Sequence, residues 1–209
     1  MITLTVRNNF PEVQRKLEAL SQNVRDRVIP AALNKVADKA RTEMKRRIAA
    51  EFNIKQGDVN SQLEVSKASR KLGIFEVRLQ PFGRRRGHIS RNVMLFKAMP
   101  TKPTSYKTVR AQIHGKWVTM KVPVGGGVSV EIRRGQRKTI EGAFIANKGR
   151  TVFIRTGKDR LPIKGVETVD VPSMFNKRTI NAAVMRKIET DLPVEFDRAI
   201  KLAIDKGWR

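Results

Sequence analysis

The stretch that decides the fold is residues 142–175, which read GAFIANKGRTVFIRTGKDRLPIKGVETVDVPSMF. An apolar run at 142–146 predicts a strand, and the basic residues after it predict a turn. The apolar run at 151–155 predicts a second, buried strand. The two prolines that follow fix φ and remove backbone donors, so residues 161–175 predict an extended crossing into the last helix. The expected core residues of this part are Phe144, Phe153 and Phe175.

The N-terminal part of the chain predicts helices after a short strand at residues 2–6. Apolar residues recur at three- or four-residue intervals over 13–28 and again over 33–48, which gives each segment one apolar face. Pro30 lacks an N–H and crowds the preceding turn, so it is predicted to kink or divide the helical region into a pair. The charged face of 34–51 is interpreted either as solvated or as lying against DNA or an acidic subunit.

The middle of the chain is rich in strand patterns, and the end returns to helix. Strand patterns occur at 63–65, 74–79, 109–113, 117–122, 128–132 and 151–154. Residues 114–116 predict a tight hairpin turn. Helical spacing resumes over 180–192 and 196–204, with Pro193 as an interruption. This segregation predicts an α+β fold with an N-terminal helix pair, a central antiparallel β-sheet with basic hairpins and a long arm, and a C-terminal helix.

The length of 209 residues suits a single domain over 1–209. Its predicted parts are a strand with helices at 1–55, a β-rich basic core at 56–175 and helices at 176–209. A polar, proline-containing stretch at about 83–104 predicts an arm, because loops this long in a compact domain are usually functional or disordered. Glycines 125–127 lack the Lys and Ser/Thr of a phosphate loop, so they are interpreted as a hairpin tip.

The positive charge is concentrated in the middle of the chain. Residues 71–165 carry 22 Lys/Arg and 4 Asp/Glu, whereas residues 166–209 carry 8 and 7, and residues 1–70 carry 14 and 8. A positive charge of this size must be balanced by a polyanion or by acidic neighbours in an assembly. Aromatic residues are sparse, so contacts to nucleic acid would fall mainly on phosphates, which carry no sequence information.

Three groups of cations are the candidate contacts to nucleic acid or to another subunit. They are Arg84, Arg85, Arg86 and Arg91; Arg133, Arg134, Arg137 and Lys138; and Lys148, Arg150, Arg155, Lys158 and Arg160. Basic turns and arms suit non-specific contact with a phosphate backbone. Solubility together with acidic protein neighbours explains the same residues equally well, and the two interpretations stay open here.

The sequence offers little for catalysis, cofactors or metals. There is no cysteine, and the two histidines, His88 and His114, lack the spacing of a zinc site. The carboxylates of the middle segment stand singly among basic residues, where ion pairing is the expected role. We therefore predict no enzyme, no cofactor and no metal. Because no apolar run reaches 18 residues, we also expect no membrane partner.

Several stretches together resemble the minor tail protein Z family of long-tailed bacteriophages and prophages, which is related to tail-completion and neck proteins. The resemblance rests on 142–146, 149–155, 161–165 and 171–175, on the opening around 31–37 and on LPVEF at 192–196. It implies a virion structural protein, made in the host cytoplasm, that completes the tail at the head–tail junction. It also implies a homo-oligomeric ring of six copies that contacts neighbouring neck and tail proteins and genomic double-stranded DNA in the channel.

A second reading is a free-standing, non-sequence-specific nucleic-acid-binding protein. The pI of about 11.3 supports it, but the chain shows no recognisable nucleic-acid-recognition motif. A dedicated DNA binder would bind duplex DNA tightly as a free monomer, with a steep salt dependence. An assembly protein would bind weakly on its own.

Overall fold

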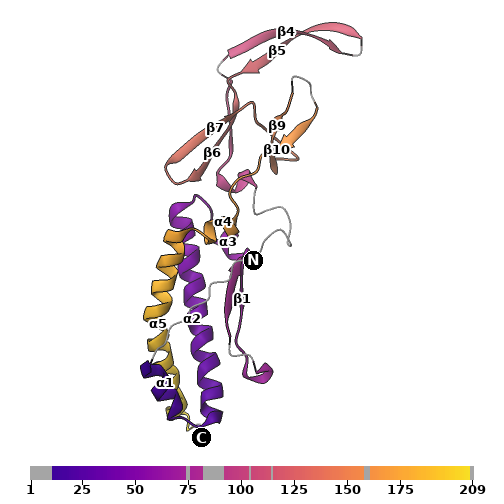
Figure 1. Ribbon diagram of the computed structural model, residues 1–209. Helices are drawn as coiled ribbons and strands as arrows, with labels where there is room; N and C mark the ends of the chain where they lie inside the picture. The colour runs from indigo at the N-terminus through magenta and orange to yellow at the C-terminus, as the bar shows by residue number, and fades with distance from the viewer. Residues whose placement is uncertain are drawn as a thin grey trace. The chain divides into compact units, whose positions relative to one another are not determined.

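A computed structural model describes residues 11–73, 76–81, 92–103, 105–113, 115–157 and 161–207 (Figure 1). It confirms the α+β class, with helices towards both ends of the chain and antiparallel sheets between them. The chain divides into two compact units. One, here the helical unit, comprises residues 1–49, 56–87 and 170–209, and the other, the β unit, comprises 50–55 and 88–169. The single-domain description stays a prediction, and the strand at 2–6 lies outside the described residues.

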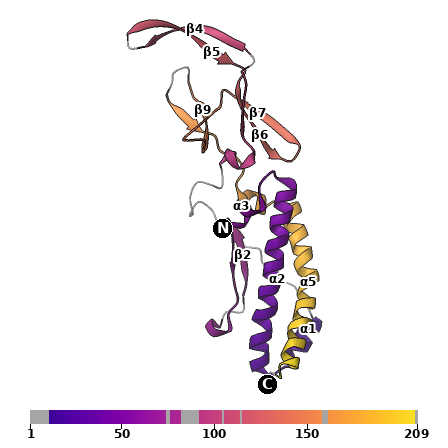
Figure 2. The same cartoon turned by 180° about the vertical axis from the view of Figure 1, so that it is seen from behind.

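The described part of the helical unit contains two long α-helices, three short ones, one 3₁₀ turn and one two-stranded ribbon. Its elements are α1 (Pro11–Glu18), α2 (Gln22–Glu51, whose last two residues belong to the β unit), α3 (Gln56–Asn60), β1 (Leu63–Ser66), η1 (Arg70–Leu72), β2 (Arg78–Pro81), α4 (Val171–Phe175) and α5 (Arg178–Asp205). In Figures 1 and 2 α2 and α5 lie side by side and antiparallel.

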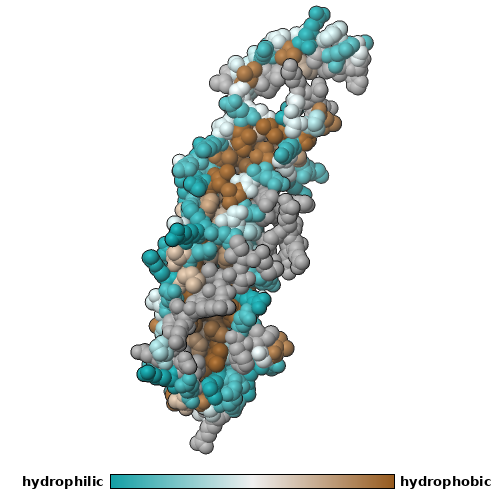
Figure 3. Space-filling model, viewed as in Figure 1, coloured by the Kyte–Doolittle hydropathy of each residue, from teal (hydrophilic) through white to brown (hydrophobic). Residues whose placement is uncertain are grey.

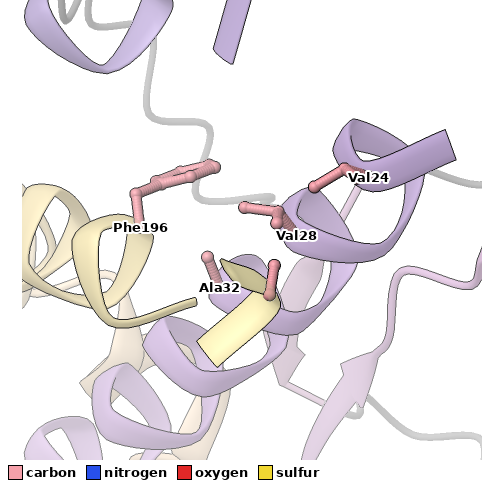
Figure 4. Packing of buried hydrophobic residues seen from close by; sticks show 5 residues of the cluster. Val24, Val28, Ala32 and Phe196 are labelled. Carbon is pink, nitrogen blue, oxygen red and sulfur yellow. The ribbon is translucent and has the colours of Figure 1, made fainter. Parts of the chain in front are cut away.

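The core of the helical unit lies between α2 and α5. Val24, Val28 and Ala32 recur at four-residue spacing on α2 and pack with Phe196 and Ala203 of α5. Figure 4 shows the Phe196 ring directed at the valines of α2. Small residues on the facing surface let the helix backbones approach closely, and the buried apolar area holds the pair together.

Neither proline divides its helix. The predicted division at Pro30 and interruption at Pro193 are wrong, because α2 and α5 each run continuously through the proline. The break between the first helices falls instead at residues 19–21. An interior proline costs a helix about 3 kcal/mol. Packing of the residues on either side of Pro30 offsets this cost, because Val28 and Ala32 are both fully buried against α5.

An ion-pair network joins the middle of α2 to α5. The Lys39 ammonium lies 2.6 Å from a carboxylate oxygen of Glu195 and 3.6 Å from Asp191. Lys187 bonds Asp191 at 2.9 Å and Arg198 bonds Glu195 at 2.7 Å. Both carboxylates are buried. This part of the 34–51 face therefore serves packing within the chain.

The network also shifts the pKa values of its members. The hydrogen bond from Lys39 lowers the pKa of Glu195, against the effect of burial. Burial disfavours the ionised form of Asp191, but the combined effect of Lys187 and Lys39 is larger, and the pKa of that carboxyl is lowered. The same hydrogen bond, which Lys39 donates to Glu195, raises the pKa of Lys39.

The β1–β2 ribbon is tied to α2 by polar contacts. Its strands are antiparallel, with Leu63 opposite Pro81. The Asn34 side chain donates to the carbonyl of Ala68 and accepts from its N–H, at 3.0 and 2.9 Å. The Arg41 guanidinium donates to the carbonyls of Asn60 and Leu63. These bonds satisfy backbone groups at the end of α3, at the start of β1 and just after β1.

The β unit consists of short antiparallel strands. Its elements are η4 (Val93–Phe96), β3 (Met99–Thr101), β4 (Ser105–Ile113), β5 (Lys116–Val124), β6 (Gly127–Arg133), β7 (Gln136–Glu141), β8 (Phe144–Ala146), β9 (Thr151–Arg155) and β10 (Ile163–Gly165). The strand orders are β3-β6-β7, β10-β9-β8 and β4-β5. The hairpin predicted around 114–116 is confirmed, since Ile113 pairs with Lys116.

The core of the β unit is aliphatic. Val93, Val128, Val130, Ala143 and Val152 form one buried cluster from η4, β6, β9 and the residue before β8. Figure 3 shows hydrophobic residues gathered in this part of the unit, with hydrophilic residues around them. The strand at 151–155 is thus anchored by Val152, as the apolar run predicts.

The predicted arm at about 83–104 is wrong in its second half. Val93 and Phe96 of η4 are fully buried, and β3 pairs with β6. Residues 92–103 therefore belong to the folded β unit, and Val93 and Phe96 lie in its core. Residues 83–91 and 104 lie outside the described part of the chain.

Three local predictions in 125–175 also change. Residues 171–175 form α4, where Asp170 caps the helix and proline occupies its first turn, in place of an extended crossing. Phe175 is fully buried as predicted, but Phe144 and Phe153 are only half-buried. Gly127 is the first residue of β6, where it pairs with Glu141, and is not part of a hairpin tip. A side chain there would meet the Ile140 carbonyl oxygen at 2.1 Å, which explains the glycine.

Candidate assembly interface

The described members of the three cation groups all lie in the β unit. Arg133, Arg134, Arg137 and Lys138 belong to the β6–β7 hairpin, and Lys148, Arg150 and Arg155 belong to the β8–β9 hairpin. The other candidates, Arg84, Arg85, Arg86, Arg91, Lys158 and Arg160, lie outside the described residues, as do both histidines.

The β6–β7 hairpin is held by its own side chains. Gly135 adopts the left-handed conformation that the tight turn needs, with φ of 75°. Its N–H donates to a Glu131 carboxylate oxygen at 2.9 Å, and Glu131 also pairs with Arg137 at 3.6 Å. The Gly135 N–H, assisted by Lys97 and Arg137, lowers the pKa of the Glu131 carboxyl against the effect of burial. Glu131 thus stabilises the turn.

Residues 51–53 support the same hairpin through the backbone. The N–H of Asn53 donates to the Ile132 carbonyl at 2.9 Å, and the N–H of Arg134 donates to Glu51 at 3.2 Å. Phe52 forms a bridge with Arg133 and is itself buried. The tip of the hairpin is therefore fixed to the rest of the β unit.

The two faces of the β6–β7 ribbon divide the basic group. Arg137 lies opposite Glu131 and donates to Ser129, whereas Lys138 lies opposite Val130 on the other face. A pocket of about 230 Å³ lies on that second face. It is lined by Val130, Ile132, Arg133, Gln136 and Lys138. An aliphatic floor with two cations at its rim suits an acidic protein side chain or a phosphate.

The β8–β9 turn presents Lys148 and Arg150 from an unusual backbone. Asn147 and Lys148 have positive φ of 55° and 54°, and Gly149 follows at 79°. Left-handed non-glycine residues cost energy and persist only where neighbouring bonds hold them. Here the Arg150 N–H donates to Ala146, and Asn92 donates to the Arg150 carbonyl at 2.7 Å. The turn thus has a defined shape, with both cationic side chains exposed.

Arg155 stands at the end of β9 over an aromatic pair. Its guanidinium lies 4.8 Å from the centre of the Phe144 ring, and Phe144 stacks on Phe153 at 6.1 Å. This cation–π contact orients an exposed arginine without neutralising it. The sequence predicts both rings as core residues. In the structure they are half-buried, and the Arg155 guanidinium lies over Phe144.

Four further cations of the β unit lie outside the three predicted cation groups. Lys107, Arg110, Lys116 and Lys121 lie on the β4–β5 hairpin. They alternate with apolar and hydroxyl residues, so a search for adjacent cations does not find them. The feature that marks them in the sequence is the absence of any Asp or Glu from residue 77 to residue 130.

The two units differ in the proportion of Lys and Arg to Asp and Glu. The β unit has 18 Lys/Arg and 5 Asp/Glu, while the helical unit has 26 and 14. Within the described ranges, no group of three or more His, Cys, Asp or Glu is arranged to hold a metal ion. None of the described helices is long and apolar enough to cross a membrane. The arrangement is one of fixed, exposed cations on short hairpins.

A family model settles the relationship that the sequence suggests. The model of the prophage minor tail protein Z family matches residues 11–205. This chain belongs to that family. No curated protein and no solved structure matches it. As a minor tail protein Z, the chain is a structural component of a phage tail and hence of the virion, a role that is typically non-enzymatic.

Proposed function

We propose that this chain completes the tail as a homo-oligomeric ring, six copies in number, at the head–tail junction around the DNA channel. The observation that carries the proposal is the set of exposed cations held on fixed turns of the β unit. Arg133, Lys148 and Arg155 have no carboxylate partner among the described residues. A closed ring supplies neighbours on both sides of each subunit.

Acidic surfaces of neighbouring neck and tail proteins are the proposed partners of these turns. Tight phosphate binding along a channel would retard DNA that has to move through it. Cations that bind an adjacent ring avoid this problem, because a contact between assembled proteins has to be stable. Contact of the same residues with channel DNA is the other outcome that an experiment can find.

Quantitative mass spectrometry of purified particles tests the proposal. We expect about six copies of the chain per particle, located at the tail end near the head by labelling of the assembled virion. Absence from particles, or a copy number as large as that of a tail-tube protein, would contradict the ring. Duplex-DNA binding by the free protein is the matched control. Tight binding with a steep salt slope would favour the nucleic-acid-binding alternative.

A further inference from the structure

The β4–β5 hairpin stands out from the rest of the β unit. Its strands pair only with each other over nine register positions, from Ser105 opposite Val124 to Ile113 opposite Lys116. In Figures 1 and 2 it extends away from the other strands of that unit. Every side chain described on these two strands is exposed. Two-stranded hairpins are marginally stable in water without a surface to pack against.

One face of this hairpin is aliphatic. Opposite residues of an antiparallel pair share a face, and successive residues alternate. The register therefore places Val109, Val118, Met120 and Val124 on one face, each 37–43 % exposed. The other face carries Tyr106, Arg110, Trp117 and Lys121, with the Arg110 guanidinium 6.0 Å from the Trp117 ring centre. The aliphatic side chains are thus gathered on one side, although no described element covers them.

The root of the hairpin is fixed to the core. Thr101 pairs with Gly127, and the Thr101 hydroxyl accepts the Gly127 N–H at 2.9 Å. Two residues lead from β5 into β6. A side chain at Gly126 would lie 3.3 Å from Pro103. The backbone at the root of the hairpin is therefore closely packed.

Charge on and around this face selects the partner. Lys107 and Lys116 share the face with the aliphatic residues, and the chain has no Asp or Glu between residues 77 and 130. Two copies joined face to face would bring these lysines together. Many carboxylates of a second copy are already bonded to its own cations, namely Asp38, Glu43, Glu76, Glu131, Asp191, Glu195 and Asp197. Duplex DNA matches the lysines but gives valine and methionine nothing to pack against.

We propose that the aliphatic face of the β4–β5 hairpin docks on an apolar surface rimmed by carboxylates that belongs to a different protein of the virion. The inference rests on the proposed function, because it takes the chain to be part of a head–tail assembly. Burial of the four aliphatic side chains supplies the free energy, and Lys107 and Lys116 set the orientation.

Photo-crosslinking in assembled particles tests this assignment. A photoreactive amino acid is placed at position 118, on the aliphatic face, or at position 119, on the opposite face of the same strand. We expect position 118 to yield one main adduct with another virion protein, at least tenfold more than position 119. An adduct with a second copy of this chain, with DNA or with nothing, or equal adducts from both positions, would overturn the inference.

Charge reversal supplies a second readout with a matched control. The double variant Lys107→Glu/Lys116→Glu should reduce the adduct from position 118 at least fivefold, while Lys121→Glu, on the other face, should leave it unchanged. Circular dichroism checks that both variants fold. Equal losses would contradict a face-specific contact. Copy number in the same particles separates the two proposals: six copies without an adduct contradict only the docking, whereas absence of the chain contradicts both.

Discussion

The helical unit and the β unit differ in how their cations are paired. In the helical unit, Lys39 bonds Glu195 at 2.6 Å, and other cations of α5 complete the network around that carboxylate and Asp191. In the β unit, Lys148 and Arg155 are exposed with no carboxylate bonded among the described residues. The comparison teaches that some cations bond carboxylates between helices and others stay exposed, while both units keep an excess of positive charge, +12 in the helical unit and +13 in the β unit.

Removing the packing of the helical unit should have the largest effect. Phe196→Ala is expected to lower the free energy of unfolding by about 3–5 kcal/mol, because the ring is buried between α2 and α5. Urea denaturation followed by helical circular dichroism measures it. Val194→Ala, at an exposed position of the same helix, should change it by less than about 1 kcal/mol. Equal losses would show that the two helices are not held by this cluster.

Breaking the network between the helices should have the next largest effect. Lys39→Met is expected to cost about 1.5–3 kcal/mol, because it removes a charged hydrogen bond to a buried carboxylate. Lys35→Met, on the exposed face of α2, serves as the control and should stay within about 0.5 kcal/mol. The same denaturation assay applies, and a neutral Lys39→Met would mean that the network adds no net stability.

Acid should remove the stability that the ion-pair network between α2 and α5 supplies. The pKa values of Asp191 and Glu195 are lowered in the folded state, so their contribution to stability is present above the ordinary carboxyl range. It is lost as the pH falls through the lowered values. We therefore expect the stability difference between the native chain and Lys39→Met to shrink from pH 7 to pH 3. A difference that is constant with pH would contradict the ionised network.

Changes to the basic turns should have the smallest effect on stability. The double variant Lys148→Gln/Arg150→Gln is expected to shift the free energy of unfolding by less than about 0.5 kcal/mol, because both side chains are exposed. The yield of tailed, infectious particles should nevertheless fall at least tenfold. Normal yield would indicate that these cations serve solubility and not assembly.

The sequence predicts the strong periodic elements well and the special positions poorly. The apolar spacing of α2 and α5 and the apolar run of β9 are enough to find those elements. Proline rules fail at Pro30, since tertiary packing outweighs a local penalty there. The motif DVPS around 170–173 is a capped helix start, with Asp170 accepting the Ser173 N–H. Reading its proline as extended overlooked that cap.

Finding the candidate interface from the sequence was possible only in part. Runs of adjacent cations mark the turns at 133–138 and 148–155, which the structure places in the β unit. The cations of the β4–β5 hairpin alternate with apolar residues, and only strand register shows which of them share a face. The predicted arm drew attention to 83–104, whereas the protruding element of the described β unit is the hairpin that follows. Polar composition does not reveal that Val93 and Phe96 fill a core.

Lysine reactivity in the free protein and in assembled particles tests the division of charge most directly. Acetylation at limiting reagent, followed by mass spectrometry, reports each ammonium separately. We predict that Lys138 and Lys148 react readily in the free protein and are protected at least fivefold in particles. Lys39 should react slowly in both states because Glu195 holds it. Equal reactivity of Lys138 and Lys148 in the two states would contradict the claim that the charge of the β unit is reserved for a partner.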